Sequence, residues 1–202
     1  ALAQTATRTL TGTGVPPAML TITDGPSYDY GIQATTSTTD HTFTVTNTGG
    51  FIASTMTGTG LAAPFSFAGG SYPGAGGTCA ANLAPAATCT IVVRFSPTVN
   101  GSFLDTIQID FYNGFTTQSS LRDVVGTGAN PALLTINDGV AYDYGTLATG
   151  STSPFTYTVS NTGGVPATGI AEVGIAAPFG FVGGTYPGTG GTCATVLNQG
   201  DS

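Results

Sequence analysis

Three cysteines are the residues of this chain best suited to covalent or metal chemistry. Cys79 and Cys89 enclose nine residues, a spacing that suits a disulfide closing the loop before a strand near Thr90. A metal site would need further Cys or His ligands close by, and the single histidine, His41, is replaced by Phe155 in a second copy of this region. The sequence therefore predicts a Cys79–Cys89 disulfide, and a disulfide implies an oxidising, extracellular or cell-surface location.

Four aspartates form the only recurrent acidic pattern, and they are weak candidates for calcium ligands. Asp24 and Asp29 belong to one Asp-Gly-x-x-Tyr-Asp-Tyr-Gly segment, and Asp138 and Asp143 belong to the other. Carboxylates together with turn carbonyl groups can hold Ca²⁺. Asp-Gly is equally an ordinary turn pair, and the second aspartate of each segment can face water while its tyrosine neighbours pack. Both interpretations stay open, and no other cofactor is expected.

Two tyrosines in Gly-rich loops are candidate binding residues. Tyr72 and Tyr186 each precede Pro-Gly in a loop that lacks the Gly-Lys-Ser/Thr ending of a phosphate-binding loop and leads into no helix. An exposed tyrosine ring could stack on a sugar or dock another subunit. The alternative is that the ring anchors its own loop against the fold.

Few side chains of this sequence could act as catalytic groups. A Ser-His-acid triad would have to use His41, and the single glutamate, Glu172, has no suggestive carboxylate partner for glycoside hydrolysis. We therefore expect no enzymatic activity.

These residues are positioned by an internal repeat. Leu20-Thr21-Ile22 returns as Leu134-Thr135-Ile136, an offset of 134 − 20 = 114. The same offset relates residues 42–50 (TFTVTNTGG) to residues 156–164 (TYTVSNTGG), and it holds without a gap as far as Cys193. In this register residues 1–14 correspond to the final strand of a preceding repeat, residues 15–128 to a complete repeat, and residues 129–202 to an incomplete one that lacks its last strands. Cys193 is then expected to carry an unpaired thiol.

Alternating apolar and polar residues predict about seven strands in the complete repeat. We place them near residues 19–23, 38–48, 53–59, 65–68, 88–96, 102–112 and 117–126. Ile91, Val93 and Phe95 should share one buried face, as should Ile107, Ile109 and Phe111. The Asn-Thr-Gly-Gly that ends the second strand is expected to tolerate positive φ where the chain turns. The predicted fold class is all-β, with tandem immunoglobulin-like antiparallel β-sandwiches.

Composition narrows the function classes. The net charge is −7 with three Lys plus Arg residues and no Trp, and only 6% of residues are charged. Nucleic acid binding needs clustered basic residues, so it is disfavoured, and no apolar run reaches the ~18–20 residues of a membrane span. Hydrophobic residues nevertheless make up 40% of the chain, which is enough to build a core.

The paired-cysteine block, together with the Asp-Tyr-Gly, Phe-Thr-Val-Thr-Asn-Thr-Gly-Gly and closing Gly-Thr-Gly segments, resembles the bacterial choice-of-anchor D repeats. These belong to the ASH/Hydin-like group of immunoglobulin-type domains. The resemblance covers the complete repeat and the visible part of the second. It implies tandem sandwiches in large secreted or surface proteins, and it implies no catalytic residues. Cys193 departs from the pattern, since no partner cysteine follows it in the sequence given.

The expected function is that of a non-enzymatic stalk or spacer in a large exported surface or filament-forming protein. Its partners would be neighbouring repeats and, in a fibre, other copies of itself. One alternative is an adhesin that recognises glycan or protein through the Tyr72 and Tyr186 loops. Another is a fibre subunit in which residues 4–14 of one molecule complete the sandwich of another.

Overall fold

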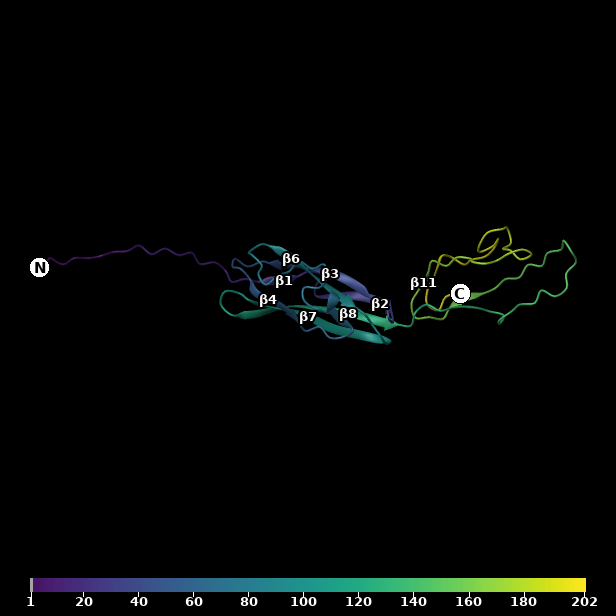
Figure 1. Ribbon diagram of the computed structural model, residues 1–202, viewed down its shortest axis with the longest axis horizontal. Helices are drawn as coiled ribbons and strands as arrows, with labels where there is room; N and C mark the ends of the chain where they lie inside the picture. The colour runs from purple at the N-terminus through teal and green to yellow at the C-terminus, as the bar shows by residue number, and fades with distance from the viewer. Residues whose placement is uncertain (1) are drawn as a thin grey trace. The chain divides into compact units, whose positions relative to one another are not determined.

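The computed structural model describes residues 2–202 and consists of short β-strands joined by turns (Figure 1). Eight strands lie between residues 20 and 129: β1 (Leu20–Ile22), β2 (Ser27–Ala34), β3 (Thr39–Asn47), β4 (Ser54–Thr59), β5 (Phe65–Phe67), β6 (Thr88–Phe95), β7 (Gly101–Tyr112) and β8 (Thr117–Ala129). One 3-10 turn, η1 (Ala68–Gly70), follows β5. No α-helix occurs among residues 2–202, and the short 3-10 turn is not long enough to cross a membrane. The all-β class is confirmed.

The eight strands form two four-stranded sheets. Their strand orders are β1-β3-β6-β5 and β2-β8-β7-β4, and β1 pairs antiparallel with β3, as β4 does with β7. Ser120 of β8 donates from its Oγ to the carbonyl oxygen of Leu20 in β1 at 3.0 Å. Arg122 of β8 donates to the carbonyl oxygen of Ile22. The second sheet therefore lies against the first, as in an immunoglobulin-like β-sandwich.

The core follows the period of two that the sequence shows. Alternate residues of β3, β6 and β7 are fully or almost fully buried, and β8 adds Val124. These buried residues are Phe43, Val45, Ile91, Val93, Phe95, Ile107, Ile109 and Phe111. The predicted inward faces of β6 and β7 are thus confirmed. Val92, expected on the outer face of β6, is also buried, because the backbone of Pro73 and Gly74 lies against it: the Val92 amide donates to the Pro73 carbonyl oxygen at 2.8 Å.

Strand β2 was missed by the sequence analysis, which predicted seven strands where the structure has eight. The segment Tyr28-Asp29-Tyr30-Gly31 reads as a turn because it contains aspartate and glycine and follows Asp24-Gly25-Pro26. In the structure this segment pairs with β8 at the edge of its sheet. Edge pairing with β8 outweighs the poor strand propensity of aspartate and glycine.

Residues 131–202 contain shorter strands. β9 (Leu134–Ile136) pairs antiparallel with β10 (Val159–Asn161), and β11 (Ala167–Thr168) pairs antiparallel with β12 (Val196–Leu197). The register of Leu134 opposite Asn161 repeats that of Leu20 opposite Asn47, 114 residues earlier.

The chain divides into two compact units, whose boundary falls within strands. The first unit contains Ala1–Tyr28, Asp40–Arg94 and Leu104–Val124, and the second contains Asp29–Thr39, Phe95–Phe103 and Val125–Ser202. The first unit holds the disulfide and most of the buried residues named above. The second unit holds Asp29–Ala34 of β2, Val125–Ala129 of β8, the adjoining ends of β6 and β7, and the four short strands β9 to β12.

Residues 2–19 form no strand. Residues 1–14 are predicted to be the last strand of a preceding repeat; Ala1 lies outside the described residues. A strand needs a neighbouring strand to bond with, and residues 2–15 make no backbone hydrogen bond within the described part of the chain. The predicted strand therefore stays a prediction.

Candidate functional site

A fully buried asparagine at the end of β3 holds four backbone groups, and we call this arrangement the asparagine clamp. The Nδ2 group of Asn47 donates to the carbonyl oxygens of Phe51 at 2.8 Å and Leu83 at 3.0 Å. Its Oδ1 accepts from the amides of Met19 at 3.2 Å and Gly49 at 3.0 Å. Two donors and two acceptor positions are thus all used, which is what a buried amide requires. The clamp joins the residue before β1, the turn after β3 and the loop before β6.

The same clamp recurs at Asn161, which is 1% exposed where Asn47 is 0% exposed. Nδ2 of Asn161 donates to Val165 at 2.9 Å and Leu197 at 3.1 Å, and its Oδ1 accepts from Leu133 at 3.2 Å and Gly163 at 3.0 Å. Every partner lies 114 residues after its counterpart. The two backbone bonds that accompany each clamp, to residues 86 and 87 and to residues 200 and 201, repeat as well.

The sequence predicts positive φ in the turn formed by residues 47–50, and that prediction is wrong. Neither Asn47 nor any of the three residues after it has positive φ. Gly49 is required because a Cβ there would lie 2.2 Å from the Pro17 carbonyl oxygen, and a Cβ on Gly163 would lie 2.2 Å from that of Pro131. One signal could have revealed the clamp: Asn47 follows buried Phe43 and Val45 at a period of two, so it falls on the core face.

The Cys79–Cys89 disulfide is formed, and it closes the loop that contains Leu83, one of the clamp partners. The bridge and the clamp therefore fix the same loop at its ends and near its middle. In the second copy Leu197 occupies the place of Leu83, and Cys193 carries a free thiol that is partly exposed.

Asp24 and His41 lie within hydrogen-bond distance at the start of the first copy. The Nε2 atom of His41 lies 3.0 Å from Oδ2 of Asp24, and Thr23 donates to the same oxygen at 3.1 Å. These hydrogen bonds, chiefly that of His41, lower the pKa of Asp24. The His41 ring also stacks on Tyr28 with centroids 3.7 Å apart. Phe155 stacks on Tyr142 in the same way, at 3.8 Å, so the position serves ring packing in both copies.

Two of the other three calcium candidates, Asp29 and Asp143, each accept a hydrogen bond within their own turn. Oδ1 of Asp29 accepts from the Gly31 amide, and Oδ1 of Asp143 accepts from the Gly145 amide, both at 2.7 Å. Asp138 shares with Asp24 a positive φ, of 71° and 61° respectively. Within residues 2–202, no group of three or more His, Cys, Asp or Glu side chains is placed to hold a metal ion.

We expect Ca²⁺ to leave the chain unchanged, because three of the four carboxylates, those of Asp24, Asp29 and Asp143, already accept hydrogen bonds from protein donors. Titration calorimetry up to about 10 mM Ca²⁺, above the ~10⁻⁴–10⁻³ M range of extracellular calcium modules, should give no saturable heat and no rise in Tm. Saturable heat that disappears in Asp24→Asn or Asp29→Asn would show that the aspartates do bind calcium.

The two candidate binding tyrosines pack against phenylalanines of their own copies. Tyr72 meets Phe67 edge-on at 5.6 Å, and Tyr186 meets Phe181 in the same geometry at 5.5 Å. Burial raises the pKa of Tyr72 to about 12. Burial also raises the pKa of Tyr186, and the neighbouring Cys193 raises it further. The rings thus hold the Gly-rich loops in place, and recognition of a sugar through them stays a prediction.

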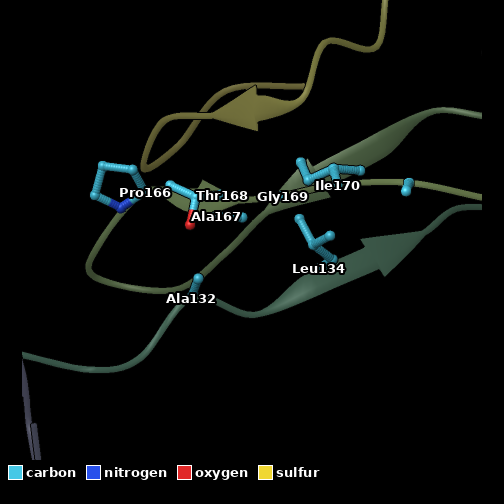
Figure 2. Close-up of a pocket in the computed structure, with 8 residues that line it drawn as sticks. Ala132, Leu134, Pro166, Ala167, Thr168, Gly169 and Ile170 are labelled. Atoms are coloured by element: carbon cyan, nitrogen blue, oxygen red, sulfur yellow. The ribbon is translucent and has the colours of Figure 1, made fainter.

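One shallow groove in the second unit is lined almost entirely by small or apolar residues (Figure 2). Its volume is about 500 Å³, and Ala132, Leu134 and residues 166–171 line it. Figure 2 shows Leu134 and Ile170 on facing segments, with Pro166 at one end. The counterparts of Ala132, Leu134 and Ala167 in the first copy are all buried. Ala167 is also buried, so among these three positions the clearest difference between the copies is at Leu134, which is 40% exposed where Leu20 is 6% exposed.

No family model matches the chain, and no curated protein matches it. Among solved structures, the VesB protease of Vibrio cholerae matches with 15% identity and a TM-score of 0.44, covering 55% of this chain and 32% of the protease. The ASH/PapD-like domain 7 of human CEP192 matches with 12% identity and a TM-score of 0.39, covering 63% and 95%. A CARDB domain from Pyrococcus furiosus, solved with two metal ions, matches with 16% identity and a TM-score of 0.34, covering 57% and 97%. Similarities this weak carry no argument about function.

Proposed function

We propose that the chain is a non-enzymatic structural spacer, built from tandem immunoglobulin-like sandwiches of an exported bacterial surface protein. The observation that carries this proposal is the asparagine clamp, which appears at Asn47 and Asn161 with every partner displaced by 114 residues. Both copies therefore contain the same set of internal hydrogen bonds around a buried asparagine. The proposal includes two further points: the chain is a member of the choice-of-anchor D repeats, and its partners are the neighbouring repeats.

The disulfide supports the same function. It closes a loop of the first copy whose Leu83 is held by Asn47. A covalent link combined with a buried polar clamp resists the separation of β3 from the loop before β6, and a spacer under tension needs that resistance. The disulfide also supports export to an oxidising compartment.

A binding module is the competing proposal, and it would use the Tyr72 and Tyr186 loops. These loops have nearly the same sequence in both copies, and both tyrosines are held by phenylalanine. That sameness supports a spacer, since binding repeats diverge in their loops. A glycan array on which the chain gives reproducible hits, lost in Tyr72→Ala, would favour the binding module.

Single-molecule stretching tests the spacer proposal. We expect the first sandwich to unfold in one force peak, with residues 79–89 shielded from extension by the disulfide. Ten residue steps at ~3.4 Å, less the 4.8 Å between the two Cα atoms, predict about 30 Å more extension in reductant. Extension at low force without a peak would show that the sandwich does not resist tension, which contradicts the spacer proposal. An unchanged length after reduction would show that the disulfide loop is not in the loaded path.

A further inference from the structure

Two asparagines of the first copy are each followed by glycine, at Asn100-Gly101 and at Asn113-Gly114. In such a pair the backbone nitrogen of the glycine can attack the side-chain amide carbon of the asparagine. The two groups are held close together by the chain, and glycine has no Cβ to hinder the approach. Each of the other asparagines precedes a larger residue. The two Asn-Gly pairs are therefore the candidates for this reaction.

The fold restrains Asn113. This residue is 9% exposed, and its Oδ1 accepts hydrogen bonds from the amides of Phe115 at 2.9 Å and Thr116 at 2.8 Å. Its backbone is bonded as well, because its amide donates to the Thr116 carbonyl oxygen and its carbonyl oxygen accepts from the Ala18 amide, both at 3.0 Å. The side chain of Asn113 therefore cannot turn toward the Gly114 nitrogen without breaking hydrogen bonds.

The surroundings of Asn100 are open. Asn100, Gly101 and Ser102 are all exposed, where the loop after β6 leads into β7. A Cβ placed on Gly101 would meet no atom within 4 Å. The Nδ2 group of Asn100 donates to Oδ1 of Asn130 at 2.9 Å, and this hydrogen bond is exposed. Water replaces such a bond at little cost, so the Asn100 amide can turn toward the Gly101 nitrogen.

We propose that Asn100 is a site of spontaneous deamidation, and that folding protects Asn113 from the same reaction. The Gly101 nitrogen bonds to Cγ of Asn100, the bond from Cγ to Nδ2 breaks, and ammonia leaves with the proton of the Gly101 amide. Water then opens the resulting succinimide ring. Attack of water at Cγ gives aspartate, and attack at the backbone carbonyl carbon gives isoaspartate. Nothing is oxidised or reduced, and the co-reactant is water.

The reaction changes the contact between Asn100 and Asn130. The product carboxylate has no N–H group, so it cannot donate to Oδ1 of Asn130. The contact is kept only if the Asn130 amide turns and donates from Nδ2. Asn130 follows β8, and its carbonyl oxygen accepts from the Gly164 amide at 3.0 Å. The modified residue thus contacts the segment that connects the two copies.

Asn130 itself is not a second site, because Pro131 has no backbone N–H that could become the nucleophile. Deamidation of Asn100 adds a negative charge and takes the net charge of the chain from −7 to −8. The reaction needs no enzyme, so the modified form accumulates with the age of the molecule. This inference does not depend on the spacer role.

Ageing of the folded and the unfolded chain tests the proposal. The 202-residue chain is kept in mildly alkaline, oxygen-labelled water, with and without denaturant, and peptide mass spectrometry measures label uptake at each asparagine. In the folded chain Asn100 should react at least about tenfold faster than Asn113, because two hydrogen bonds to Oδ1 of Asn113 must first break. In denaturant the two sites should react at similar rates, since each precedes glycine.

Equal rates at the two sites of the folded chain, or a faster reaction at Asn113, overturn the proposal. A folded-state rate at Asn100 more than about tenfold below its rate in denaturant overturns it as well, because the fold would then protect both sites.

Two variants identify the residue that produces the more acidic form, which ion-exchange chromatography separates. Asn100→Gln keeps the amide but requires a larger ring, so the acidic form should appear at least about tenfold more slowly. Asn82→Gln is the matched control, because Asn82 is exposed and precedes Leu83. It should leave the rate unchanged. An acidic form that appears as fast in Asn100→Gln as in the wild-type chain contradicts the assignment to Asn100.

Discussion

Asn47→Ala is expected to destabilise the first sandwich by more than removal of its disulfide does. The change removes the partners of two amides, at Met19 and Gly49, and of two carbonyl oxygens, at Phe51 and Leu83. An unsatisfied buried polar group costs roughly 1–3 kcal/mol. Water can enter the space left by the side chain and recover part of this cost, so we expect a loss of about 3–5 kcal/mol in the free energy of unfolding.

Chemical denaturation measures this loss, and the corresponding fall in Tm should be roughly 15 °C or more for a sandwich of this size. Asn47→Leu keeps the branched shape of the side chain and removes its hydrogen bonds, so it should be at least as destabilising. Thr48→Ala is the matched control, because Thr48 is exposed and its hydroxyl makes a single bond to the Met19 carbonyl oxygen. It should cost less than about 1 kcal/mol. If Asn47→Ala behaves like Thr48→Ala, the clamp does not hold the fold.

Removing the disulfide should produce the second largest effect. In Cys79→Ser with Cys89→Ser, the unfolded chain regains the freedom of a loop whose ends are 10 residues apart in sequence. The chain-entropy estimate for a loop of this length is about 3 kcal/mol. Both cysteines are buried, so serine adds a small desolvation cost to the loss.

Cys193→Ser is the control for this pair, since Cys193 is the free thiol of the described residues and should be replaceable without loss of stability. Denaturant midpoints of the three proteins, measured with and without reductant, separate the effects. The wild-type chain in reductant should approach the double variant. A loss below about 1 kcal/mol would mean that the unfolded loop is already restricted by other means.

The features that depend on local pattern could be predicted from the sequence. The inward faces of β6 and β7 follow from a strict period of two, and the Cys79–Cys89 bridge follows from spacing within one loop. Strand β2 could not be predicted, because Asp29 and Gly31 are poor strand residues and the segment forms a strand only through pairing with β8, about 90 residues away.

The asparagine clamp shows a different limit. The position of Asn47 on the core face is visible in the alternation with Phe43 and Val45, but its four partners come from three separate segments. No local rule connects Asn47 with Leu83, which is 36 residues away. Likewise, the need for Gly49 arises from the close approach of Pro17, whereas the sequence suggested a turn with positive φ.

The side-chain amide protons of Asn47 and Asn161 provide the most direct test that each copy contains the same asparagine clamp. NMR measures the exchange of each Nδ2 proton pair with solvent, and Asn100, whose bond to Asn130 is exposed, supplies the reference. We predict much slower exchange at Asn47 and Asn161 than at Asn100, because both clamp side chains are buried and fully bonded. Exchange at Asn47 or Asn161 as fast as at Asn100 would contradict the repeated clamp, and with it the main support for a structural spacer.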